Sequence, residues 1–269
     1  TFSKTPRHPA WSPKAPYEEG PYESAAAMNQ KKVSRIKRAI IMGAGKGTRM
    51  APLTDRMPKP LVPFSGRPLI DHALDRLVAA GIEEVVVNLH YMADMLEAHL
   101  KSRKDVRIIL SDERDLLLET GGGVKKARPL LGDDPVMTFN ADSVWVEGRE
   151  PILTRMMQAW DPARMDALLM IANATNTIGE VRRGDFTMDQ DGRLTRREPS
   201  TVAPFMYAGV QIIKPPLFDK GPDGPFSTNL IWDQIKERDR LFGLRMDATW
   251  MHVGTPGDLA DAETFLRDL

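Results

Sequence analysis

The chain has 269 residues, 42% of them hydrophobic and 28% charged, which is enough for one large α/β domain or two small ones. Its 37 Lys and Arg residues balance 37 Asp and Glu residues, so no overall positive field favours nucleic acid or an anionic membrane. Cysteine is absent, which excludes disulfide bridges and thiolate metal sites. With no long apolar run and no visible signal peptide, we expect a cytoplasmic protein that binds neither nucleic acid nor membrane.

The first part of the chain, residues 1–37, differs from the rest. It is rich in proline and aromatic residues and shows neither helical nor strand periodicity. We expect an N-terminal extension that is either a loose tail or an arm packed on a neighbouring molecule.

From residue 38 onwards, strand-like and helix-like segments alternate. The expected strands are 39–42, 84–89, 106–110 and 136–139, and the expected helices are 70–80, 93–101 and 124–131. This alternation predicts an α/β fold with a Rossmann-like, mainly parallel mixed sheet flanked by helices. Ligands of such sheets lie beyond the carboxyl ends of the strands.

The pattern loosens after residue 150. We expect helices at 152–160, 229–238 and 256–266, strands at 167–171 and 207–213, and a hairpin of 185–188 with 194–197. These elements predict a C-terminal α+β portion that covers the ligand edge of the sheet.

The segment after the first strand is rich in glycine and carries fixed cations. Gly43, Gly45 and Gly47 allow the backbone to close on phosphate oxygens, and Arg49 and Lys59 follow. A Walker A loop does not fit, because a Ser or Thr is needed where Gly47 stands. A dinucleotide-binding fingerprint also fits poorly, because no acidic residue stands about 20 positions further on.

The order Gly-x-Gly-Thr-Arg, Pro-Leu-Thr and Pro-Lys-Pro resembles the signature of sugar-1-phosphate nucleotidyltransferases. The resemblance implies the nucleotide-diphospho-sugar transferase fold and an enzyme that joins a nucleoside triphosphate to a sugar-1-phosphate, releasing pyrophosphate. It also implies one domain over 38–269, with a nucleotide-binding part (38–150) and a sugar-binding part (151–269).

The resemblance assigns roles to individual positions. The residues matching the loop that holds the triphosphate are Gly43, Ala44, Gly45, Lys46, Gly47, Thr48 and Arg49. Gly121 and Gly122 match the backbone that lies against the base, and Glu119 matches an acid on the sugar side. Lys59 matches the lysine on the reacting phosphates, and Asp142 matches a Mg²⁺ ligand, so Arg49, Lys59 and Asp142 are the expected catalytic residues.

The sugar pocket is less sharply marked. By the surroundings of each residue we expect it to include Gly184, Glu198, Tyr207 and Asn229. Asn88 ends a strand near the expected base pocket, where it would line the site.

One position departs from the signature. The segment Trp-Met-His-Val-Gly-Thr resembles a Trp-x-Asp-x-Gly-Thr segment whose Asp is the second metal ligand, and here that position is His252. Imidazole is a poor ligand for Mg²⁺. Three alternatives stay open: Asp142 suffices alone, Asp112 or Asp258 substitutes for the missing acid, or the enzyme uses Mn²⁺.

Among the members of this family, the chain most resembles N-acetylmuramate-1-phosphate uridylyltransferases of peptidoglycan recycling. Short mannose-1-phosphate guanylyltransferases share nearly all of the same motifs and are the alternative. A hypothesis from another class is a non-catalytic sugar-nucleotide sensor, favoured by His252 and opposed by the intact catalytic residues. We expect a monomer or a homodimer.

Overall fold

A mixed sheet of nine strands organises the structure, a computed structural model that describes residues 36–179 and 183–269. Its main path runs β11-β10-β12-β6-β1-β4-β5, and β8 joins β12 to β13. The strands are β1 (Arg38–Met42), β4 (Glu84–Leu89), β5 (Arg107–Asp112), β6 (Val136–Asn140), β8 (Ala167–Asn173), β10 (Phe186–Met188), β11 (Leu194–Arg196), β12 (Phe205–Ile213) and β13 (Leu241–Arg245).

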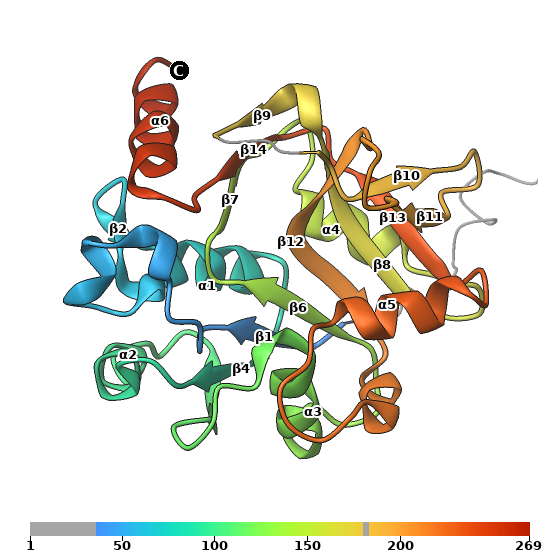
Figure 1. The fold of residues 1–269 in the computed structure, drawn as a ribbon. Coiled ribbons are helices and arrows are strands. Elements are labelled where there is room, and N and C mark those ends of the chain that lie inside the picture. Colours follow the sequence, from blue (N-terminus) through green and yellow to red (C-terminus); the bar gives the residue numbers. More distant parts are fainter. Residues whose placement is uncertain (1–35, 180–182) are drawn as a thin grey trace, which may run out of the picture. The chain divides into compact units, whose positions relative to one another are not determined.

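Four neighbouring strands form the parallel centre of this sheet (Figure 1). β1 pairs in parallel with β4 on one side and with β6 on the other, and β5 pairs in parallel with β4. Helices cover both faces, so β1 and β4 read as continuous apolar runs rather than as alternating patterns. The expected α/β fold with a mixed sheet flanked by helices is therefore confirmed.

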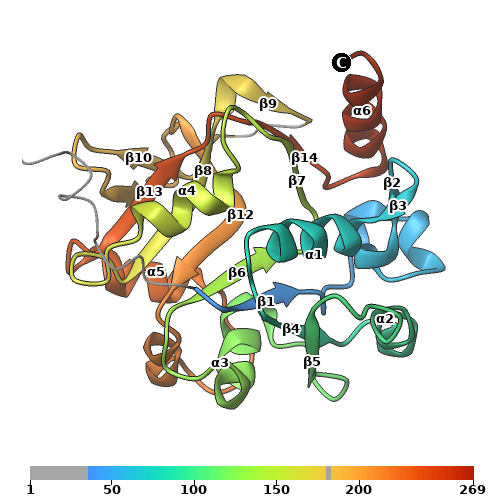
Figure 2. The ribbon, with the colours of Figure 1, turned by 180° about the vertical axis from the view of Figure 1, so that it is seen from behind.

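Helices are distributed over the two faces of the sheet, which Figures 1 and 2 show from opposite sides. One face packs against α1 (Leu69–Ala79), α2 (Ala93–Leu100) and α4 (Ile152–Ala159). The other packs against α3 (Glu119–Leu131), α5 (Asn229–Lys236) and the short helix η5 (Pro215–Lys220). Successive residues of a strand serve opposite faces, so Ile41 lies in the first cluster and Ile40 in the second.

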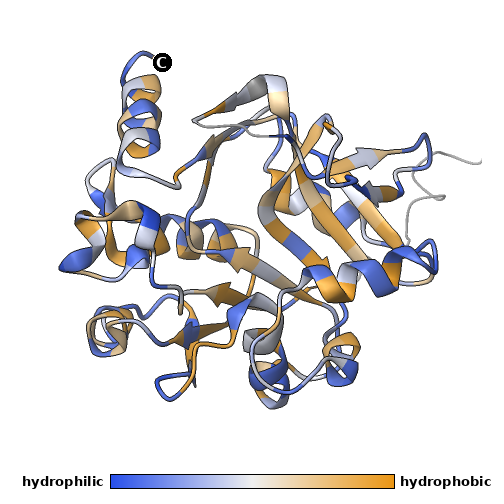
Figure 3. Cartoon of the chain, in the orientation of Figure 1, coloured by the Kyte–Doolittle hydropathy of each residue, from blue (hydrophilic) through white to orange (hydrophobic). Residues whose placement is uncertain are grey.

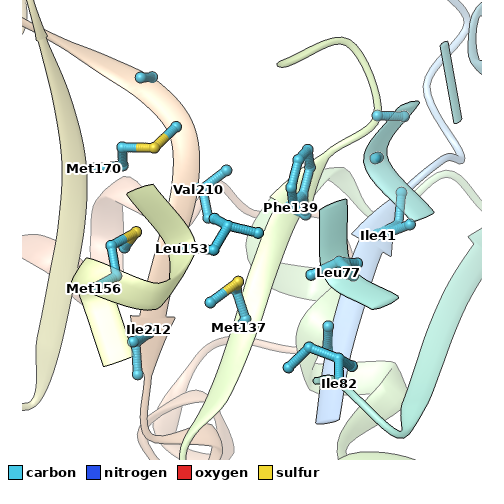
Figure 4. Packing of buried hydrophobic residues seen from close by; sticks show 14 of the residues in the cluster. Ile41, Leu77, Ile82, Met137, Phe139, Leu153, Met156, Met170, Val210 and Ile212 are labelled. Carbon is cyan, nitrogen blue, oxygen red and sulfur yellow. The ribbon is translucent and has the colours of Figure 1, made fainter. Parts of the chain in front are cut away.

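The core around β6 shows how the two halves of the chain share one interior. Figure 4 places Met137 and Phe139 of β6 beside Val210 of β12, with Leu153 of α4 packed over them. In Figure 3 the strands are largely orange and the loop tips are blue, as expected for a buried sheet. The 151–269 part thus does not stand apart as a separate layer, because β8, β12 and β13 extend the same sheet.

A second, three-stranded sheet has the order β7-β14-β9. Its strands are β7 (Ser143–Val146), β9 (Thr177–Ile178) and β14 (Thr249–His252), and α6 (Pro256–Arg267) packs on it. The smaller elements are β2 (Pro63–Phe64), β3 (Arg67–Pro68), η1 (Thr48–Met50), η2 (Leu53–Asp55), η3 (Lys59–Leu61) and η4 (Ala174–Asn176).

The predicted helices and strands of residues 38–269 are all present, within a few residues of their expected bounds, except that α3 begins at Glu119 rather than 124. The periodicity did not reveal β7, β13 and β14. Residues 1–35 of the expected N-terminal extension lie outside the described residues. No helix in the described part of the chain is long and apolar enough to cross a membrane.

Candidate active site

The glycine-rich loop leaves the carboxyl end of β1 and is anchored from β4. The Asn88 side-chain oxygen accepts hydrogen bonds from the N–H groups of Gly43 (2.6 Å) and Ala44 (3.3 Å). The Asn88 amide nitrogen in turn donates to Glu113 Oε1 at 2.8 Å. Glu113 is fully buried, and burial raises the pKa of its carboxyl although Asn88 and the Leu118 N–H bind it. This buried chain of hydrogen bonds, which we name the Asn88–Glu113 relay, therefore fixes the start of the loop.

Gly47 brings the loop against the lysine of the Pro-Lys-Pro segment. Its φ of 62° is left-handed, and a Cβ there would lie 2.8 Å from Lys59 Cβ and 3.0 Å from Thr54 Cγ2. The Thr54 hydroxyl donates to the Gly47 carbonyl at 3.0 Å. Only glycine fits this position without moving Lys59.

Lys59 and Asp142 meet although 83 positions separate them in the chain. Lys59 Nζ donates to Asp142 Oδ2, and the two side chains are 14% and 31% exposed. Burial raises the pKa of Asp142, but the charge and the hydrogen bond of Lys59 outweigh it and hold that pKa below its usual value. The expected catalytic pair is thus a preformed ion pair beside the glycine loop.

His252 lies next to this pair, because β14 pairs with β7 so that His252 stands opposite Ser143. Burial lowers the pKa of His252; Arg49 and Lys59 lower it further, while Asp142 and Asp258 oppose them. The ring and the Arg49 guanidinium flank Gly254, where a Cβ would lie 2.5 Å from His252 Nε2 and 3.2 Å from Arg49 Nη1.

The two alternative acids are differently placed. Asp258 lies in the first turn of α6, where its Oδ2 accepts a hydrogen bond from the Thr255 hydroxyl at 2.8 Å, and it lies close enough to His252 to affect the pKa of that ring. Asp112 ends β5 and is paired with Arg114. Over residues 36–179 and 183–269, no three His, Cys, Asp or Glu side chains cluster closely enough to hold a metal ion.

A cavity of about 450 Å³ opens over the carboxyl ends of β1, β4 and β6; we name it the loop cavity. Gly43, Ala44, Gly45, Gly47, Lys59, Asn88, Glu119 and Asp142 line it, all of them singled out from the sequence. Asn140, Thr120 and Ser227 line it as well and were not predicted. Asn140 could have been found, because it ends the strand that leads to Asp142.

A second cavity of about 300 Å³, the sheet cavity, adjoins the first, since Met42, Thr120, Asn140 and Ser227 line both. Tyr207 and Asn229, two of the residues expected in a sugar pocket, line it. Burial raises the pKa of Tyr207, so its phenol stays protonated. Asp185 and Arg197, which sequence reasoning missed, line it too.

A third cavity of about 310 Å³, the arginine cavity, is lined by Arg49, Arg183, Gly184, Asp185, Arg197, Met206 and His252. It adjoins the sheet cavity through Asp185 and Arg197. It contains the predicted residues Arg49, Gly184 and His252.

Other predicted residues lie outside these three cavities, as far as the described residues define them. Lys46 and Thr48 are exposed on the loop, and Glu198 is exposed after β11. Gly121 and Gly122 are buried in the first turn of α3, where both N–H groups donate to the Phe226 carbonyl, at 2.8 and 3.1 Å. In the structure these two glycines allow residues 224–226 to pack closely on α3.

Comparison with known proteins agrees with this geometry. The profile of the nucleotidyl transferase family matches residues 38–185. N-acetylmuramate alpha-1-phosphate uridylyltransferase of Caulobacter vibrioides is 45% identical over 236 residues, covering 86% of this chain and 98% of that protein. Mannose-1-phosphate guanylyltransferase catalytic subunit beta of Xenopus tropicalis is 28% identical over 239 residues, covering 82% of this chain and 62% of that protein.

Solved structures share the fold. The crystal structure of HddC from Yersinia pseudotuberculosis superposes with a TM-score of 0.69 at 19% identity, covering 86% of this chain and 100% of that one. The glycine loop, the Lys59–Asp142 pair and these similarities agree: the chain belongs to the nucleotidyl transferase family and is a sugar-1-phosphate nucleotidyltransferase.

Proposed function

We propose that this enzyme transfers a uridylyl group from UTP to N-acetylmuramate-1-phosphate, giving UDP-N-acetylmuramate and pyrophosphate. The observation that carries the proposal is the Lys59–Asp142 pair in one cavity with the glycine loop. The relative named for this reaction spans nearly the whole domain at 45% identity. Since UDP-N-acetylmuramate is a cell-wall precursor, the reaction would belong to peptidoglycan recycling in the cytoplasm.

The reaction needs the protein mainly to position the substrates and to compensate their charge. An oxygen of the sugar phosphate attacks the α-phosphorus of UTP, the bond from that phosphorus to the bridging oxygen breaks, and pyrophosphate leaves. The attacking phosphate is already an anion, so no residue has to take up a proton. Catalysis therefore rests on aligning the phosphates and compensating their negative charge.

Lys59 is placed for both tasks. Its ammonium group lies at the border of the glycine loop and Asp142, where it would bind the α-phosphate and the sugar phosphate. Pairing with Asp142 positions this ammonium group before substrate binds, which reduces reorganisation in the transition state. Arg49 supplies a second cation from the arginine cavity.

The donor set fits a Mg²⁺ ion that takes most of its ligands from substrate. Mg²⁺ is commonly held by one or two carboxylates together with phosphate oxygens and water. Asp142 is the carboxylate beside Lys59 that would hold the ion, and burial holds His252 mainly neutral. When bound, the ion would neutralise charge on the phosphates; Mn²⁺, which tolerates imidazole better, is the alternative.

The cavities suggest how the substrates divide between them. We assign the nucleotide to the loop cavity, in the 38–150 part, and the sugar to the sheet cavity, which Tyr207 and Asn229 line from the 151–269 part. Because Asn140 and Thr120 line both cavities, the reacting phosphates would meet at this shared wall.

The test is pyrophosphate release measured for UTP, GTP, CTP and dTTP, each with N-acetylmuramate-1-phosphate, mannose-1-phosphate and N-acetylglucosamine-1-phosphate. We expect the highest kcat/KM with UTP and N-acetylmuramate-1-phosphate. A preference for GTP with mannose-1-phosphate would establish the guanylyltransferase alternative instead. Nucleotide-sugar binding without any pyrophosphate release would establish the sensor.

A further inference from the structure

The arginine cavity is lined by guanidinium groups that form no ion pair with a described residue. Across residues 36–179 and 183–269, no carboxylate lies within ion-pair distance of Arg49, Arg183 or Arg197. Most other arginines of the described chain are paired, and the chain as a whole carries no net charge. Among the described residues, the three guanidinium groups around about 310 Å³ are thus without an ion pair, which favours an anion there.

A turn at Gly184 fixes the backbone of Arg183 and the side chain of Arg197. Gly184 has a φ of 70°, and a Cβ there would lie 2.0 Å from the Ala203 carbonyl oxygen. Arg183 precedes the turn, and its own carbonyl accepts the Ala203 N–H at 2.8 Å. Arg197 Nε donates to the Gly184 carbonyl at 2.9 Å, so the turn brings the backbone of Arg183 and the side chain of Arg197 together.

The guanidinium groups of Arg183 and Arg197 have N–H donors left to bind a ligand. Arg197 uses Nε and Nη1 on backbone carbonyls, among them those of Glu198 (2.9 Å) and Pro199 (3.0 Å), and no described residue binds its Nη2. With the described residues, the Arg183 side chain makes one long contact, from Nη1 to the Pro199 carbonyl at 3.4 Å. Asp185 is the acid that lines the cavity, and its Oδ2 accepts the Tyr207 N–H at 2.9 Å.

The position of the cavity indicates what it binds. Arg49 and His252 line it near Lys59 and Asp142, while Arg197 and Asp185 also line the sheet cavity assigned to the sugar. A sugar seated there would direct a ring substituent towards Arg183 and Arg197. Mannose and N-acetylglucosamine offer only neutral groups, whereas N-acetylmuramate carries a lactyl ether that ends in a carboxylate.

We propose that Arg183 and Arg197 bind the lactyl carboxylate of the sugar phosphate and so select N-acetylmuramate-1-phosphate over sugars without an acid. This inference rests on the proposed function and adds the residues that would carry the sugar specificity. Arginine suits the task because its planar fork matches a carboxylate in two hydrogen bonds.

The test compares Arg183→Gln with Arg245→Gln, which removes an exposed arginine of β13 that lines none of the three cavities. We expect Arg183→Gln to lower kcat/KM for N-acetylmuramate-1-phosphate about 10- to 100-fold, the loss expected for one charge-assisted contact. The KM for UTP should stay unchanged, and Arg245→Gln should behave as wild type. Arg197→Lys, which keeps the charge but not the fork, should lie between the two.

Product binding gives a second readout that does not depend on turnover. Calorimetry should show that wild type binds UDP-N-acetylmuramate more tightly than UDP-N-acetylglucosamine, and that Arg183→Gln loses this preference by weakening only the first. Equal weakening of both products, an unchanged preference, or a raised KM for UTP would overturn the inference while leaving the proposed function intact. If wild type does not use N-acetylmuramate-1-phosphate at all, the proposed function itself fails.

Discussion

Exchanging the polar groups of Asn88 and Glu113 tests how the glycine loop is held. In the wild type the Asn88 oxygen binds the Gly43 and Ala44 N–H groups, and its nitrogen donates to Glu113 at 2.8 Å. The double variant Asn88→Asp/Glu113→Gln keeps every donor facing an acceptor and keeps the net charge. Each single variant breaks this match.

The size of the effect follows from the contacts that are lost. Asn88→Asp keeps both loop hydrogen bonds but sets two carboxylates against each other inside the core, replacing a charge-assisted hydrogen bond of ~1.5–3 kcal/mol. In Glu113→Gln, one amide N–H must face another donor, at Asn88 or at the Leu118 N–H, which costs ~1–3 kcal/mol. We expect each single variant to lose ~2–3 kcal/mol of unfolding free energy, and the double variant to recover most of it.

Thermal unfolding and the KM for UTP are the two assays. Both single variants should raise the KM for UTP, because the loop they loosen is the one assigned to the triphosphate, and the double variant should restore it. Asp166→Asn is the matched control: Asp166 is buried and paired with Lys214 and Arg240 outside the three cavities, so it should lower stability without changing the KM. Additive losses in the double variant, or lost stability with unchanged KM in the single variants, would refute the relay.

Three further results are expected. Asp142→Asn should lower turnover at saturating Mg²⁺ about 10²- to 10³-fold, because Lys59 loses the group that positions it, and unaltered pyrophosphate release would contradict its role. Gly47→Ala should lower kcat about tenfold or more, because the added Cβ displaces Lys59. The control Gly66→Ala is also at positive φ (77°) but has open space around it, so it should cost only ~1 kcal/mol of stability. Equal activity of the two variants would argue against the close contact between Gly47 and Lys59. Because the pKa of Glu113 is raised in the folded state, its contribution to stability is complete below the usual pKa of 4.5 and declines as the pH rises through the raised pKa. The free energy of unfolding of wild type, compared with that of Glu113→Gln, should therefore fall as the pH rises from 4.5 through the raised pKa. A difference between the two proteins that does not change with pH would show that the pKa is not raised.

Much of the fold follows from local sequence patterns. The runs of β1 and β4 and the amphipathic face of α1 are periodic enough to be recognised without a partner. β14 was missed because its four residues show little periodicity, and it pairs with β7 and β9, which lie far from it in the sequence. Its pairing with β7 places His252 beside Asp142.

The site residues that belong to one sequence motif could be predicted, whereas contacts between residues that are brought together only by the fold could not. Asp142 directly follows a buried strand, so its place at the sheet edge could be expected. The contact between Asn88 and Glu113 depends on the pairing of β4 with β5, and the contact of Arg197 with Gly184 depends on the turn there. No spacing in the sequence encodes those contacts.

The central claim is tested most directly by a competition in a single reaction. The enzyme is given equal concentrations of UTP, GTP, CTP and dTTP together with equal concentrations of the three sugar-1-phosphates. The nucleotide sugars formed at early times are separated, identified and quantified by mass spectrometry. The account predicts that UDP-N-acetylmuramate predominates and that Asp142→Asn forms little of any product. Predominance of GDP-mannose, or of a nucleotide sugar without the lactyl group, would contradict it.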